Sequence, residues 1–164
     1  MSRQLVVGLA LLTLCYPSVA KPWRGIVPLE STRADVERLL GRPKDPIDGR
    51  YYLSDEIVFF EYAGNGCKQS PNVAGWPNRP VRWNVKPDTV VLIGIKHRNP
   101  LPLSSLFKDL SKFTRSADTH QSTIFYYEDK SEGFTIETFE EDGVELIRGY
   151  IYEPGAGHES LLCK

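Results

Sequence analysis

The sequence lacks the residue patterns that accompany the commonest catalytic and metal-binding sites. It has only three histidines and three cysteines, and none stands in a His-Glu-x-x-His or Cys-x-x-Cys pattern. It also has no Gly-x-Ser-x-Gly elbow, no phosphate-binding glycine loop and no dinucleotide-binding fingerprint. We therefore expect no metal, no cofactor and no catalytic residues, and we interpret the protein as a non-enzyme.

The sequence also has little net charge and little uninterrupted apolar sequence. Its formal net charge is −1, so nothing favours nucleic acid or an anionic membrane as a partner. Beyond residue 20 no apolar run approaches the roughly 18 residues that a transmembrane helix needs. We therefore expect no transmembrane segment.

The one apolar run, near the N-terminus, predicts export. Residues 1–20 have a basic start at Arg3, an apolar stretch from Leu5 to Leu14 and a small-x-small site ending at Ala20, which together are typical of a signal peptide. Cleavage near Ala20 would place the protein in the periplasm or outside the cell. Cys15 leaves lipoprotein processing as an alternative, although Leu14 does not fit the residue expected before a lipidated cysteine.

Only Cys67 and Cys163 remain after this cleavage. In an oxidising compartment, two cysteines far apart in sequence predict one disulfide bond. The alternative is a reactive thiol, but neither cysteine has a His or Asp as its sequence neighbour.

Residues 21–164 have a length typical of a single domain. Thr32 and Asp35 have the spacing of a capping box, while Val36, Leu39 and Leu40 would form the apolar face of a short helix. Gly41 would end the helix in the left-handed conformation. The stretches 50–53 and 57–62 predict a β-hairpin, and residues 89–97 predict a buried strand ended by Asn99-Pro100.

A second helix is expected over 103–113, followed by strands over 123–128, 133–139 and 144–152. Segments 88–100 and 142–154 match at Asp, Val, Leu, Ile and Pro. We therefore predict an α+β fold of two tandem half-repeats, about 26–100 and 101–154. Each repeat would have one helix and three strands, and the helices would pack on one face of an antiparallel sheet.

The long irregular stretch 63–88 would be a loop inserted into the first half-repeat. It is basic and contains residues of the types enriched at binding hot spots, namely Trp76, Trp83, Arg79 and Arg82. We take these four as the candidate binding residues. The alternative is that the tryptophans only anchor the loop on the sheet.

The run Leu29-x-Ser-Thr-Arg-x-Asp-Val-x-x-Leu-Leu-Gly-x-Pro43, followed by an aromatic hairpin, resembles the helix-opening motif of the SmpA/OmlA family and of β-lactamase-inhibitor-like domains. The resemblance implies a small exported binding module without catalysis, with helices packed on an antiparallel sheet.

We therefore expect a non-catalytic protein-binding module of the cell envelope, whose partner is another envelope or secreted protein. One alternative is an exported hydrolase assembled from scattered residues such as His97, Asp88 and Glu137. Another is a structural envelope protein that self-associates by pairing its acidic segment 128–142 with the basic loop. The acidic segment could equally be an ordinary solvated hairpin.

Overall fold

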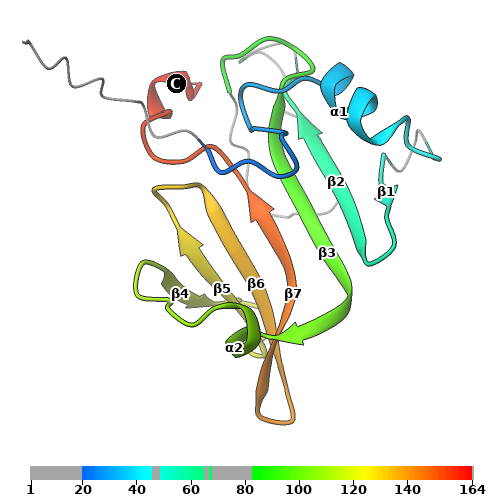
Figure 1. The fold of residues 1–164 in the computed structure, drawn as a ribbon. Coiled ribbons are helices and arrows are strands. Elements are labelled where there is room, and N and C mark those ends of the chain that lie inside the picture. The colour runs from blue at the N-terminus through cyan, green and yellow to red at the C-terminus, as the bar shows by residue number, and fades with distance from the viewer. Residues whose placement is uncertain (1–19, 46–48, 65–66, 68–82, 164) are drawn as a thin grey trace, which may run out of the picture.

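The computed structural model describes residues 20–45, 49–64, 67 and 83–163, and one antiparallel sheet dominates it (Figure 1). The sheet has seven strands, in the order β1-β2-β3-β7-β6-β5-β4. In chain order the strands are β1 (Tyr51–Tyr52), β2 (Glu56–Tyr62), β3 (Val90–Pro102), β4 (Thr114–Ala117), β5 (Ile124–Asp129), β6 (Phe134–Glu141) and β7 (Val144–Tyr152). The predicted signal peptide lies outside the described residues, apart from Ala20.

The core is built on the two central strands. On β3, Ile93 and Ile95 are 0% and 4% exposed, and they pair with Tyr152 and Tyr150 of β7. These side chains share one face because alternate residues of a strand point the same way. The segment before helix α1 (Arg33–Leu40) adds Trp23 and Ile26 to the same core.

Helix α1 (Arg33–Leu40) has the predicted ends. The Thr32 side chain accepts a hydrogen bond from the Asp35 backbone N–H, and the Asp35 carboxylate accepts one from the Thr32 N–H. Gly41 ends the helix with a φ of 78°. One detail of the prediction is wrong: Val36 is fully buried, but Leu39 is 52% exposed, so the apolar face is narrower than expected.

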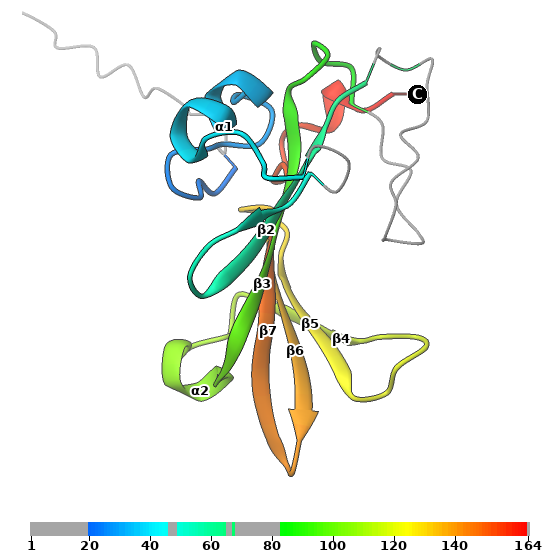
Figure 2. The same ribbon diagram turned by 90° about the vertical axis from the view of Figure 1, so that its right-hand side faces the viewer.

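The predicted fold class is wrong. The structure is mostly sheet, with a helix of eight residues and one of four, and not two repeats of a helix and three strands with helices packed on one face. Helices α1 and α2 (Leu103–Leu106) lie near opposite ends of β3 (Figures 1 and 2). The part of the chain after β3 contributes four strands to the sheet, because β4 is added to the three that were expected.

The helix expected over 103–113 stops at Leu106 for local reasons. Its N-cap is Pro102, which makes no side-chain capping bond, and Phe107 already has extended backbone angles. The Asp109 carboxylate then accepts a hydrogen bond from the Ser111 N–H, which holds a turn in place of helix. Phe107, Leu110 and Phe113 still pack on the core, but from an irregular segment.

The end of β3 also differs from expectation. The strand continues through Asn99-Pro100 to Pro102, with a register shift against β7 between Lys96 and Leu101. The hairpin signal at Asp142-Gly143 is confirmed, since β6 and β7 pair up to Glu141↔Val144 and both turn residues have positive φ.

The predicted disulfide between Cys67 and Cys163 is present and joins residues 96 positions apart. It ties the C-terminal tail to the start of the long 63–88 stretch. Within the described part of the chain, neither helix has the length and apolarity that crossing a membrane would require.

Candidate binding cavity beside β2

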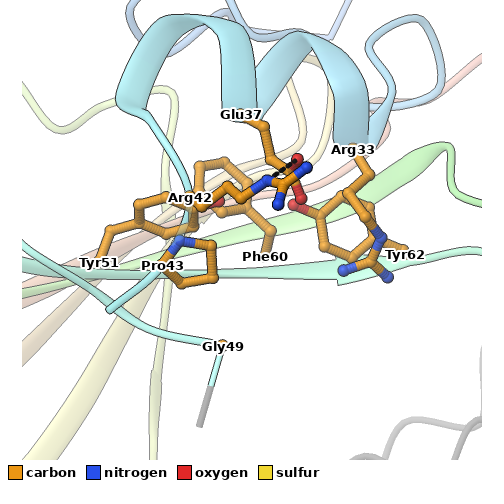
Figure 3. Close-up of a pocket in the computed structure, with 8 residues that line it drawn as sticks. All are labelled: Arg33, Glu37, Arg42, Pro43, Gly49, Tyr51, Phe60 and Tyr62. Atoms are coloured by element: carbon orange, nitrogen blue, oxygen red, sulfur yellow. Dashed lines mark ion pairs between the residues drawn. The ribbon is translucent and has the colours of Figure 1, made fainter. Parts of the chain in front are cut away.

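A cavity of about 500 Å³ lies between α1 and the outer part of β2 (Figure 3). It combines aromatic rings with charged side chains. Its lining consists of Arg33, Glu37, Arg42, Pro43, Gly49, Tyr51, Phe60 and Tyr62. This volume matches the size of a small ligand or of one or two protein side chains.

Three aromatic rings form the wall that faces α1. Phe60 and Tyr62 of β2 have ring centroids 6.2 Å apart in a stacked arrangement, and Tyr51 of β1 meets Phe60 edge to face at 5.5 Å. The hairpin register explains this grouping, because Tyr51 pairs with Val58, whose side chain lies on the same face as that of Phe60. Tyr51 is 7% exposed, so the wall is anchored in the core.

Helix α1 and the turn that follows it supply the charges. The Arg33 guanidinium lies 3.9 Å from the centre of the Tyr62 ring and donates from Nε to an Asp88 carboxylate oxygen at 2.9 Å. Arg42 forms a looser ion pair with Glu37, at 3.6 Å from Nε to the carboxylate. The Arg42 side chain is 88% exposed, so it can turn towards a bound group at small cost.

The two phenol groups of the cavity remain protonated at neutral pH. Burial raises the pKa of Tyr51, and the negative charge of Glu37 raises it further. Burial is also the main reason why the pKa of Tyr62 lies far above its usual value of 10.0, with Tyr51 as a smaller contribution. Both hydroxyls are therefore neutral hydrogen-bond donors.

The cavity adjoins a part of the sheet edge where no described strand pairs with β2. Strand β1 pairs with β2 only at Ile57 and Val58, and no other strand of the described chain covers β2 from Phe59 to Tyr62 on that side. The Leu53 N–H donates to the Glu56 carbonyl at 2.9 Å, so the backbone of Glu56 points towards β1. Because backbone direction alternates along a strand, the N–H and C=O of Phe60 also point outward, away from β3.

The arrangement is suited to binding. An apolar group can lie against the rings, while the tyrosine hydroxyls and guanidinium groups donate hydrogen bonds to its polar atoms. Across the described ranges, no group of three or more His, Cys, Asp or Glu side chains is placed to hold a metal ion.

The binding residues chosen from the sequence do not line this cavity. Trp76, Arg79 and Arg82 lie outside the described residues. Trp83 is half-buried and bridges to Leu162 of the C-terminal tail, and the next N–H along the chain donates to Leu161 at 2.7 Å. Trp83 is thus held against the C-terminal tail.

The residues considered for a hydrolase are not brought together. His97 packs edge to face on Tyr150, while Asp88 binds Arg33 at the other end of β3. Glu137 accepts a hydrogen bond from Arg148 and shares a row of the sheet with Lys96. Because Lys96 and His97 are consecutive, their side chains point to opposite faces of the sheet. His97 therefore lies on the face opposite to that of Glu137.

The acidic segment 128–142 also makes contacts within the chain. Asp129 and Glu132 bind Lys112, and Glu137 binds Arg148. Part of its charge is therefore neutralised by nearby cations.

In the sequence, the cavity residues have the patterns of a helix surface, a turn and two strands. The available signal was a pair of alternating aromatic residues, Phe60 and Tyr62, beside a helix with arginines at both ends, Arg33 and Arg42. Comparison with protein-family models, with curated proteins and with solved structures finds no match to this chain.

Proposed function

We propose that the protein is an exported, non-catalytic binding module that holds another envelope or secreted protein at the cavity between α1 and β2. The observation that carries this proposal is the cavity itself, in which three aromatic rings and two guanidinium groups meet at a part of the sheet edge that no strand among the described residues pairs with. Aromatic and arginine side chains are the types enriched where proteins bind one another most strongly.

The signal-like N-terminus and the disulfide support the compartment part of the proposal. Disulfides persist in exported proteins and are rare in the reducing cytosol. The exported location is tested directly by fractionating the source cells and determining the N-terminus of the purified protein, which we expect near Lys21.

The binding part is tested by affinity capture from the exported fraction, followed by measurement with the purified partner. We expect wild type to capture a partner whose affinity falls at least about tenfold with Tyr62→Ala. The matched control is Tyr52→Ala, which removes a 46% exposed tyrosine of the same hairpin that does not line the cavity. Thermal unfolding of both variants separates lost binding from lost folding.

Equal affinity of the purified partner for wild type and for a folded Tyr62→Ala variant would contradict binding at this cavity. Turnover of a substrate by the purified protein would contradict the non-catalytic assignment.

A further inference from the structure

We propose that the partner contributes an extended peptide segment, which adds as a strand to the outer edge of β2 and inserts an apolar side chain into the cavity. This inference rests on the proposed protein-binding function and specifies its mode. It combines two features that lie side by side: the outward backbone of Phe60, which no strand of the described residues pairs with, and the aromatic wall to which the Phe60 ring belongs.

The backbone at Phe60 offers the hydrogen bonds. Phe60 lies opposite Ile93 in the β2–β3 pairing, at a position where its own N–H and C=O face the other way. Past Val58, β1 no longer covers these groups. An added strand would satisfy both of them, as occurs when extended peptides bind at sheet edges.

The cavity offers selectivity for side chains. In an added strand, alternate residues point to the same face, so one side chain next to Phe60 would be directed towards the aromatic wall. Tyr51, Phe60 and Tyr62 then provide an apolar surface on which a large aliphatic or aromatic side chain can pack.

The charges predict what flanks that side chain. Figure 3 shows the Arg42 side chain extending above Phe60 to Glu37, and the Arg33 guanidinium beside Tyr62. Because β1 already pairs with Val58, the added strand continues from Phe60 towards Tyr62. A residue two positions from the inserted side chain on that side points to the same face and comes near these guanidiniums. Arg33 is already bound to Asp88 at 2.9 Å, whereas Arg42 pairs with Glu37 only at 3.6 Å and is 88% exposed, so an acidic residue is favoured within reach of Arg42. The expected peptide therefore has a large apolar residue and an Asp or Glu two positions away.

The probe is a displayed library of random twelve-residue peptides, selected on the whole exported protein with its disulfide intact. We expect enrichment of the apolar-x-acidic pattern in either direction. The most enriched peptide is then synthesised unmodified and with single backbone nitrogens methylated, one position at a time. Only alternate N–H groups of an added strand face β2, so methylation should weaken binding about tenfold or more at those alternate positions only.

Charge substitutions test the predicted contact between Arg42 and the acidic residue of the peptide. Arg42→Glu should weaken binding of the enriched peptide about tenfold, because it reverses the charge that meets the acidic residue. Lys44→Glu makes a comparable charge change at an exposed residue outside the cavity lining, and it should change the affinity less than about twofold.

The proposal would be overturned if the library yields no peptide whose binding is weakened by Tyr62→Ala. Methylation effects that do not alternate would also overturn it, as would concentration-dependent self-association abolished by Arg42→Glu, which would identify a second copy as the occupant. If the purified natural partner still depends on Tyr62 while strand addition fails, the protein-binding function stands and only its mode is wrong. If neither the partner nor any peptide depends on Tyr62, both fail.

Discussion

The two edges of the sheet differ in whether their polar groups are bound to other groups of the same chain. At one edge, β1 pairs with two residues of β2, and no strand in the described ranges pairs with the outward backbone groups of Phe60, beside the cavity. At the other edge, β4 lies on β5, and the polar side chains nearby bind one another. Arg115 lies 3.7 Å over the Phe125 ring and donates to the Tyr127 hydroxyl at 2.9 Å.

Glu145 completes the network at the β4 edge. Its carboxylate accepts hydrogen bonds from the Tyr127 hydroxyl at 2.8 Å and from the Thr138 hydroxyl at 2.6 Å. Thr138 is fully buried. A polar network that satisfies its own members stabilises the fold and leaves little for a ligand, whereas the exposed Arg42–Glu37 pair leaves its groups available. We therefore expect substitutions at the β4 edge to affect stability and substitutions at the β2 edge to affect binding.

The largest expected loss of stability follows from Glu145→Ala. This change removes the carboxylate that accepts from the Tyr127 and Thr138 hydroxyls, and it leaves Thr138 only its longer hydrogen bond to the Phe125 carbonyl, at 3.3 Å. Arg115 also loses its nearby carboxylate, so the free energy of unfolding should fall by about 2–3 kcal/mol. Denaturant unfolding measures it. The matched control is Glu140→Ala, an exposed glutamate opposite Glu145 on β6, which should change stability by less than about 0.5 kcal/mol. Equal effects of the two variants would remove the contrast between the edges.

A second acid on the same side of the sheet is also tightly bound. Asp129 is 3% exposed, and burial alone would raise the pKa of its carboxyl. Hydrogen bonds from Ser131, Lys112 and the Glu132 N–H outweigh burial and lower the pKa to about 2. Asp129→Asn should therefore cost about 2 kcal/mol at neutral pH, through loss of charge-assisted hydrogen bonds.

The pH dependence of stability tests whether the charge of Asp129 causes this loss. The unfolded carboxyl titrates near 3.8 and the folded one near 2, so between these values the unfolded state binds more protons. Wild-type stability should accordingly be complete above about pH 4 and fall as the pH drops towards 2. In Asp129→Asn this contribution should be missing, and the stabilities of the two proteins should converge at low pH. A constant difference across this range would contradict the role of the charge.

Local signals explain which parts of the structure were predictable from the sequence. The capping box at Thr32 and the Asp142-Gly143 hairpin depend on neighbours within four residues, and both were predicted. The helix over 103–113 was not, because its apolar spacing reflected Phe107 and Leu110 reaching the core from an irregular segment. Strand β4 was missed because all four of its residues are exposed and show no alternation.

The cavity was unpredictable for a different reason. It depends on how far β1 extends along β2 and on where α1 sits above that edge, and neither distance is encoded in a short sequence pattern. The loop predicted as the binding site has residue types that are common at binding sites, but its sequence has no periodic spacing that predicts which of them lie together. Most of this loop lies outside the described residues.

The cap of α1 tests whether this helix is needed to form the cavity. Thr32→Ala removes the hydroxyl that accepts from the Asp35 N–H, which should cost about 1 kcal/mol of stability. Because Arg33 and Glu37 belong to this helix, binding of the enriched peptide should weaken as well. Thr32→Ser keeps the hydroxyl and should restore both properties. Lower stability with unchanged peptide binding would show that α1 does not shape the site.

The smallest change in stability is expected for Arg42→Ala, at the cavity. Its partner Glu37 is 3.6 Å away and the arginine side chain is 88% exposed, so water screens the pair and its loss should change the free energy of unfolding by less than about 0.5 kcal/mol. Affinity for an acidic peptide should still fall, because the guanidinium is free to turn towards the ligand. Denaturant unfolding and peptide titration on the same sample separate the two effects. A loss of stability as large as that of Glu145→Ala would mean that the Arg42–Glu37 pair holds the fold together, and the two edges would then not differ in the way their charges are used.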